Sequence, residues 1–197
     1  KENKYIVAMY ELSGEFDLAI EIESPNPSRF NKELKKVANL IPTLTNYKIL
    51  LNVVTFIYPR SYMATDDNII KRVRQHIIVG GDRDIKSFNN SEMTIMKNLL
   101  YNPKIRLKTL AKSSDLNIKT TISILKDLQE KQIIKGFKYV IDTNKLSISK
   151  FRLFLKLHHL TRERESQLMD FMVKAKEIVQ VNMTVGDWDM EVDIESF

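Results

Sequence analysis

The sequence contains no cysteine, so it has neither a disulfide framework nor a thiolate metal site. Histidine is also scarce, and His76, His158 and His159 do not have metal-ligand spacing with nearby carboxylates. These absences argue against zinc chemistry, and we expect no cofactor. The chain also lacks an activated nucleophile and a phosphate-binding loop, which argues against an enzyme on a ferredoxin-like scaffold.

Long apolar runs are missing too. No stretch approaches the roughly 18 to 20 consecutive apolar residues that a membrane span needs, and the N-terminus lacks the run of a secretory signal. We therefore expect a soluble, cytoplasmic protein with no membrane partner. Because the chain starts at Lys1 without a methionine and stops at Phe197 after an apolar strand pattern, we also expect it to be part of a longer polypeptide.

The positive charge is unevenly distributed. The 197 residues are 43% hydrophobic, which is ordinary for a globular protein, and carry a net charge of +6. Between residues 88 and 146, eleven lysines and arginines accompany five acidic residues, whereas the rest of the chain has twenty of each sign. The whole excess therefore lies in this middle segment, and a local basic excess favours a polyanionic partner.

A repeat relates the two ends of the chain. GEFDLAIEIES (residues 14–24) and GDWDMEVDIES (residues 186–196) share glycine, an acid, an aromatic residue and aspartate, then alternating apolar positions, at a constant offset of 172 residues. Glycine supplies the positive φ that a tight turn needs, and the alternation places one apolar face on a core. Each copy is therefore predicted to be a β-hairpin.

The segments around the two hairpins complement each other. After the first hairpin come a helical pattern (residues 24–42) and a β-rich run (residues 47–59), which predict β-β-α-β. Before the second come a strand (residues 150–160) and a helix (residues 161–177), which predict β-α-β-β. Overlaying the two copies on the shared hairpin outlines a ferredoxin-like βαββαβ domain, of which each copy is a part.

The middle segment is predicted to form three short helices and a hairpin. NSEMTIMKNLLYNP has an N-cap and a proline stop, IRLKTLAKSSDLN ends in a polar turn, and IKTTISILKDLQEKQ begins after Asn117 as N-cap. The apolar residues of the third helix, at helical spacing, are Ile118, Ile122, Leu125 and Leu128. Two short β runs around Gly136 complete a winged helix-turn-helix.

The chain is therefore predicted to be an α+β protein with four parts. A partial αβ domain covers residues 1–64, a linker 65–87, the winged helix-turn-helix 88–147, and a second partial αβ domain 148–197. Basic residues of the linker could add phosphate contacts, although a plain solvated connector is the simpler interpretation. These residues are Lys71, Arg72 and Arg74.

DNA recognition assigns roles within the middle segment. The N-terminal part of the second helix of such a pair enters the major groove, and basic and hydroxyl groups around it hold phosphates. The predicted DNA-binding residues are Arg106, Lys108, Lys119, Thr120, Ser123, Lys126, Lys135 and Lys138. The first two begin the preceding helix, where backbone N–H groups favour a phosphate, and the last two lie on the wing. Alternatively, these lysines are only the solvated face of a small helical domain.

The chain resembles the Lrp/AsnC (feast/famine) family of transcriptional regulators. In the middle segment the resemblance rests on LAKSSDLN (residues 110–117), on the transition from Leu128 to Ile134 and on the KGF turn (residues 135–137). At the two ends it rests on the Gly-x-aromatic-Asp hairpins. It implies binding to promoter DNA, homo-oligomers built through the αβ domains, and an amino-acid effector bound near the hairpin turn. The candidate effector-binding residues are Gly14, Phe16, Asp17, Gly186, Trp188 and Asp189. In the alternative interpretation each aspartate only closes its own turn through a hydrogen bond to the backbone.

Two features depart from the family pattern. The family usually places arginines in the recognition helix, where this chain has Ser123 and Ile124, so a non-DNA-binding assembly or sensing module with a degenerate winged helix stays an alternative. An αβ part also precedes the DNA-binding segment, which suggests a tandem of two units. We accordingly expect a second winged helix upstream of Lys1.

Overall fold

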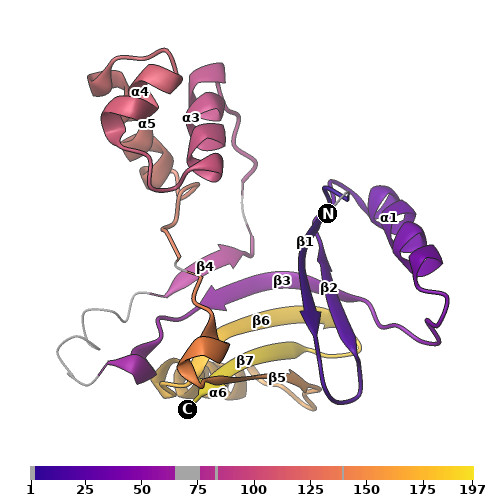
Figure 1. The fold of residues 1–197 in the computed structure, drawn as a ribbon. Helices are drawn as coiled ribbons and strands as arrows, with labels where there is room; N and C mark the ends of the chain where they lie inside the picture. The colour runs from indigo at the N-terminus through magenta and orange to yellow at the C-terminus, as the bar shows by residue number, and fades with distance from the viewer. Residues whose placement is uncertain (1–2, 65–75, 83, 139) are drawn as a thin grey trace. The chain divides into compact units, whose positions relative to one another are not determined.

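A computed structural model describes residues 3–64, 76–82, 84–138 and 140–197 (Figure 1). The chain divides into two compact units, Lys1–Lys48 and Ile49–Phe197. The basic linker residues Lys71, Arg72 and Arg74 lie outside the described residues.

The first unit consists of a hairpin and one helix. Strands β1 (Ile6–Glu11) and β2 (Leu18–Ile22) pair antiparallel, and α1 (Pro27–Leu40) follows. The helix begins there because the Asn26 side chain accepts a hydrogen bond from the Arg29 N–H at 2.9 Å and because proline is compatible with the first helical position.

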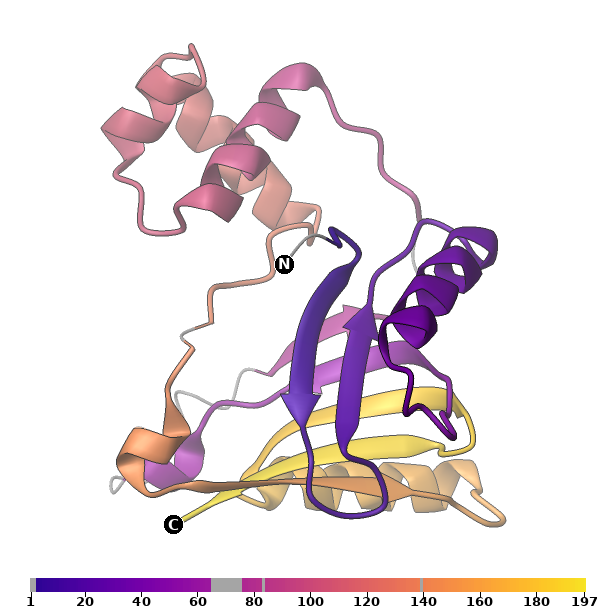
Figure 2. The ribbon, with the colours of Figure 1, turned by 45° about the vertical axis from the view of Figure 1, so that its right-hand side comes forward.

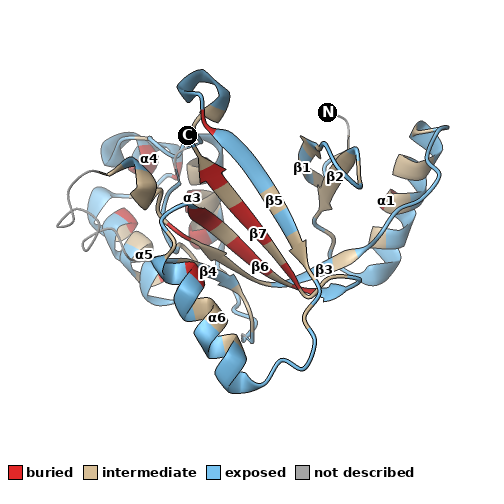
Figure 3. Ribbon diagram, turned by 90° about the horizontal axis from the view of Figure 1, so that it is seen from below, coloured by how far each residue is buried: buried red, intermediate tan, exposed pale blue. Residues whose placement is uncertain are grey.

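The second unit contains a five-stranded antiparallel sheet in the order β4-β3-β6-β7-β5. The strands are β3 (Leu50–Ile57), β4 (Ile77–Gly80), β5 (Ser149–Leu155), β6 (Ile178–Gly186) and β7 (Met190–Ser196). Helix α6 (Arg162–Lys174) contributes Met172 to a core with Val181, Met190 and Val192. Figure 3 shows that buried residues of this sheet are concentrated on β6 and β7.

The same unit contains a three-helix bundle formed by α3 (Asn90–Tyr101), α4 (Leu107–Ser113) and α5 (Ile118–Glu130). The helices gather around Ile95, Leu110 and Leu128, none of which is more than 2% exposed. Figure 2 shows the bundle from a second side. These are the three helices predicted for the middle segment, because caps and apolar spacing are local signals.

The two repeated hairpins agree in structural detail. The register Glu11↔Leu18 has its counterpart 172 residues later in Met183↔Met190, and both hairpins have a bulge at the equivalent place. The turn is closed by the same backbone bond in each, Leu12 N–H to Asp17 O at 2.9 Å and Thr184 N–H to Asp189 O at 3.0 Å. The shared sequence pattern therefore corresponds to a shared backbone geometry.

Strand β3 differs from its predicted role. It was expected to complete the first partial domain, residues 1–64, but it pairs with β6 of the C-terminal part and with β4. Pairing with β3 gives the backbone N–H and C=O groups at the outer edge of β6 their hydrogen-bond partners. It also lets Phe56 and Tyr58 join the core of the second unit. Part of the predicted linker is likewise a strand, β4.

The described residues of the predicted wing form no hairpin either. Gln132 adopts a left-handed conformation (φ 57°), and the N–H groups of Ile133 and Ile134 donate to the Leu128 carbonyl, which caps α5. Both isoleucines then pack against the bundle core. The segment is used as a helix cap, and the described residues from 133 to 142 contain no strand.

Candidate nucleic-acid interface

The turn between α4 and α5 is a helix cap followed directly by a new helix start. Asp115 adopts a left-handed conformation (φ 54°), which Asp tolerates better than most residues, and the Leu116 N–H donates to the Ala111 carbonyl at 2.9 Å. Leu116 packs against the bundle core. The Asn117 side chain then accepts from the Thr120 N–H at 2.8 Å and starts α5.

One face of α5 belongs to the core. Thr121 and Leu128 are fully buried, and Ile124 and Leu125 pack beside them. The Thr121 hydroxyl donates to the Asn117 carbonyl at 2.9 Å, which satisfies it in the interior. Successive helical residues are about 100° apart, so the direction opposite this core is occupied by Lys119, Ser123 and Lys126.

The opposite face is exposed and basic. Lys119 and Ser123 are exposed, and the Lys126 side chain is 75% exposed, with an exposed ion pair to Glu130 at 3.6 Å. Ile118 and Ile122 flank these residues at 44% and 49% exposure. The predicted apolar stripe is therefore wrong at its N-terminal end, because Thr121 takes the core position beside Leu128.

Another lysine of the helix pair has a structural role. Lys131 binds Glu92 at 3.0 Å and also Asp127, and Glu92 is buried in the capping box that starts α3. Hydrogen bonds from the Lys131 ammonium to Asp127 and then Glu92 raise the pKa of Lys131. This contact connects the end of α5 to the start of α3, so Lys131 contributes to the bundle rather than to its exposed face.

The remaining predicted DNA-binding residues lie at the start of α4, at the start of α5 and in the segment after α5. Arg106 and Lys108, at the start of α4, are exposed, and Thr120 is half-buried at the start of α5. Lys135 and Lys138 are not on a wing, since the described residues form none. Desolvation lowers the pKa of Lys138, and the Arg60 and Lys150 cations lower it further. Their contact with DNA stays a prediction.

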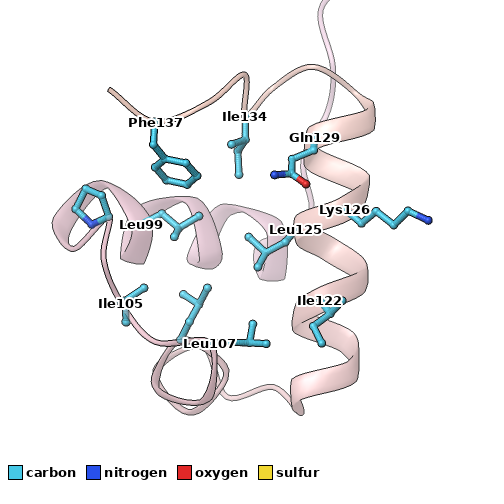
Figure 4. Close-up of a pocket in the computed structure, with 11 residues that line it drawn as sticks. Leu99, Ile105, Leu107, Ile122, Leu125, Lys126, Gln129, Ile134 and Phe137 are labelled. Carbon is cyan, nitrogen blue, oxygen red and sulfur yellow. The ribbon is translucent and has the colours of Figure 1, made fainter. Parts of the chain in front are cut away.

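An apolar groove of about 460 Å³ lies beside the exposed face of α5 (Figure 4). Leu107, Ile122 and Phe137 line it and are 36%, 49% and 61% exposed. In Figure 4, Lys126 extends away from the groove. Phe137 belongs to the KGF turn of the predicted wing, and its position in this groove was not predicted from the sequence.

The candidate effector residues of the second hairpin are Gly186, Trp188 and Asp189, and the side chains of the last two contact other residues of the fold. The Asp189 carboxylate accepts from the Leu157 N–H at 2.8 Å and binds Lys156 at 3.2 Å. The Leu157 hydrogen bond is the main reason that the pKa of Asp189 is lowered, and Lys156 adds to it. The Asp189 carboxylate therefore holds the segment after β5, while the backbone carbonyl of Asp189 closes its own turn. The Trp188 ring is half-buried and contacts Phe154.

The candidate effector residues of the first hairpin, Gly14, Phe16 and Asp17, lie in the first unit. Asp17 is exposed, and Lys48 lies 5.6 Å from the centre of the Phe16 ring in a cation-π contact. Gly14 has a φ of 154°, and a Cβ added to it would meet no heavy atom within 4 Å. The hairpin turn of the first unit is thus more open than that of the second.

Gly186 is expected to tolerate alanine less well than Gly14. Both have a positive φ near 150°, but a Cβ on Gly186 would lie 2.5 Å from the Ile49 carbonyl oxygen. Gly186→Ala should lower local stability by about 1 to 3 kcal/mol more than Gly14→Ala, because only the former also overpacks. Hydrogen exchange of the two hairpins measures this, and equal losses in protection would contradict it.

The residues that the structure describes contain no group of three or more His, Asp or Glu side chains that could hold a metal ion. None of their helices combines the length and apolarity that a membrane span requires.

The chain is similar to several solved structures at low sequence identity. A crystal structure described as PH0061 matches with a TM-score of 0.50 and 16% identity, over 56% of this chain and 74% of that chain. An AsnC family transcriptional regulator from Agrobacterium tumefaciens matches with a TM-score of 0.46 and 16% identity, over 55% and 71%. The transcriptional regulator NMB0573 in complex with L-Met, from Neisseria meningitidis, matches with a TM-score of 0.48 and 14% identity, over 56% and 71%.

These similarities are structural. No family model matches the sequence, and no curated protein matches it either. At 16% identity the PH0061 match shows a shared fold over about half of this chain. Function has to be argued from the residues of the bundle and the sheet.

Proposed function

We propose that this chain is a sequence-specific DNA-binding transcriptional regulator whose α5 lies in the major groove. The observation that carries the proposal is the exposed face of α5, where Lys119, Ser123 and Lys126 lie opposite the buried Thr121 and Leu128. Residues 88–146, which include the bundle, also carry the whole excess positive charge of the chain. A helix pair joined by a short turn, with lysines on the exposed face of its second helix, fits the groove and its phosphates.

The surrounding groups have complementary roles in this proposal. Lys119 and Ser123 are near the N-terminal end of α5, which is the part of a recognition helix that reaches base edges. Arg106 and Lys108 on α4, together with Lys126, contact phosphates and set the register on the duplex. Lys131 takes no part, since Glu92 and Asp127 hold it.

Lys119→Ala should weaken binding to the preferred duplex by about 1 to 3 kcal/mol if Lys119 reads a base. Lys126→Ala, at a phosphate position, should weaken binding to all sequences alike. Lys97→Ala is the matched control, because it removes an exposed lysine from α3 of the same bundle. A mobility-shift titration measures the affinities. Equal affinities for wild type, Lys119→Ala and Lys97→Ala would contradict the proposed role of α5.

The αβ parts are proposed to mediate homo-oligomerisation and to sense an amino-acid effector. The resemblance of the hairpins to the Gly-x-aromatic-Asp turns of the Lrp/AsnC family supports this role. Asp17 is the better candidate for an effector amine, because the Asp189 carboxylate already binds Leu157 and Lys156. Isothermal titration with the common amino acids tests the sensing role, and no heat from any of them would count against it.

A second candidate function is an assembly module in which the bundle contacts protein. The apolar groove at Leu107, Ile122 and Phe137 favours it, because exposed apolar surface is typical of protein contacts. The mobility shift separates the two candidates. Self-association that requires Phe137, with no shift of any duplex, would favour the assembly module.

A further inference from the structure

Two aliphatic side chains lie beside the basic residues of α5. Ile118 and Ile122 are one helical turn apart and are 44% and 49% exposed. Helical spacing places them roughly 60° and 100° around the axis from Thr121, on the flank between the core and the exposed Lys119 and Ser123. Exposing the two isoleucine side chains to water is unfavourable in free energy, and contact with an apolar group would remove that cost.

The chemistry available to these two turns is narrow. Base edges in the major groove are read by Arg or Lys at guanine, by Asn or Gln at adenine, by acids at cytosine, and by apolar side chains at the thymine methyl group. Residues 118–124 contain no arginine, glutamine, asparagine or acid, and the side-chain oxygen of Asn117 is used to cap the helix. The exposed candidates for base contact are therefore Lys119, Ser123 and the two isoleucines.

We infer that Ile118 and Ile122 contact thymine methyl groups, so that the chain selects duplex sites with thymines at defined positions in the major groove. This inference rests on the proposed DNA binding. The occupant of the surface is duplex DNA, because Lys119 and Lys126 border the isoleucines with charge complementary to phosphates. Each methyl group that is covered adds about fourfold to the affinity.

The apolar groove gives Ile122 a competing use. Ile122 also lines that groove with Leu107 and Phe137, and a protein segment seated there would cover the same side chain (Figure 4). Ile118 does not line the groove. A protein occupant would therefore involve Ile122 alone, whereas thymine recognition involves both isoleucines.

Replacing thymidine by deoxyuridine tests the inference, because only the methyl group is lost. A random-sequence library of short duplexes is selected on the protein, and the best-bound sequence is then synthesised in both forms. Wild type should bind the thymidine duplex about four- to sixteenfold more tightly, for one or two covered methyl groups. Ile118→Ala and Ile122→Ala should each reduce this ratio toward one, and Lys119→Ala should weaken both duplexes while keeping the ratio.

The outcomes separate the inference from the function on which it rests. Equal affinity of wild type for both duplexes overturns thymine recognition but leaves DNA binding intact. An unchanged ratio in both isoleucine variants overturns it as well. No binding to any duplex overturns the proposed function and the inference together. Circular dichroism of the variants checks that the bundle is folded, which is expected because both side chains are half-exposed.

Discussion

Glu195→Gln is expected to lower the free energy of unfolding of the second unit by about 3 to 5 kcal/mol. Glu195 is 1% exposed at the end of β7, and its carboxylate binds the Arg60 guanidinium through two bonds of 2.6 and 2.9 Å. The Tyr62 hydroxyl donates to the same carboxylate at 2.7 Å. Glutamine keeps the size but leaves the partly buried Arg60 charge without its counter-ion, and urea unfolding measures the loss.

The repeat offers a matched control for this variant. Glu23 is the equivalent residue 172 positions earlier, and its N–H donates to Tyr5 O just as the Glu195 N–H donates to Glu177 O, both at 2.9 Å. Glu23 is exposed, so Glu23→Gln should change stability by less than about 0.5 kcal/mol. Similar losses in the two variants would show that the ion pair with Arg60 does not stabilise the fold.

The pH dependence of Glu195→Gln gives a second measurement. Burial by itself raises the pKa of Glu195, but the hydrogen bonds from Arg60 and Tyr62 together with the Arg60 and Lys150 charges outweigh burial, so the pKa is lowered. The stabilisation is therefore complete above the unfolded-state value of about 4.3 and is lost as the pH falls through the folded-state pKa. The stability difference between wild type and Glu195→Gln should accordingly shrink in acid.

Raising the salt concentration from about 50 to about 200 mM should reduce DNA affinity by roughly 10² to 10³-fold. Each neutralised phosphate adds about −0.9 to the slope of log affinity against log salt, and we expect about four to six such contacts from the basic residues of the bundle and of the segment that follows it. These residues are Arg106, Lys108, Lys119, Lys126, Lys135 and Lys138. A mobility-shift titration at several salt concentrations gives the slope.

A phosphate-contact variant provides the internal control for the salt series. Lys126→Ala should reduce the magnitude of the slope by about one, because one fewer counterion is released. Lys97→Ala should leave it unchanged. A slope near zero in wild type would contradict groove binding and would favour the assembly module.

Local patterns were sufficient to predict the helices and the hairpin turns. Asn117 caps α5 as the sequence pattern indicates, since a cap involves only neighbouring residues. Helix α3 is capped by Asn89, one residue before the Asn or Ser at which the pattern placed the cap. The two Gly-x-aromatic-Asp turns likewise form the same backbone geometry in both copies. The predicted charge on α5 also lies on its exposed face, since a residue's place around a helix follows from its spacing.

Long-range pairing was not predictable in the same way. Strand β3 was assigned to the nearer hairpin, but the edge of β6 pairs with it instead, more than a hundred residues later in the chain. The pairing of Arg60 with Glu195 depends on that choice, because Arg60 follows β3 and Glu195 lies near the end of β7. Sequence spacing does not indicate which of several apolar strands will share an edge.

The sequence by itself determined the three helices, the turn between α4 and α5, the repeated hairpins and the concentration of positive charge in the bundle. Each of these depends on residues within a few positions of one another or on composition. The tertiary structure decided which strand accompanies β6, that the segment after α5 caps a helix instead of forming a wing, and that Ile118 and Ile122 stay in solvent. These outcomes depend on which surfaces compete for burial, and only the assembled core resolves that competition.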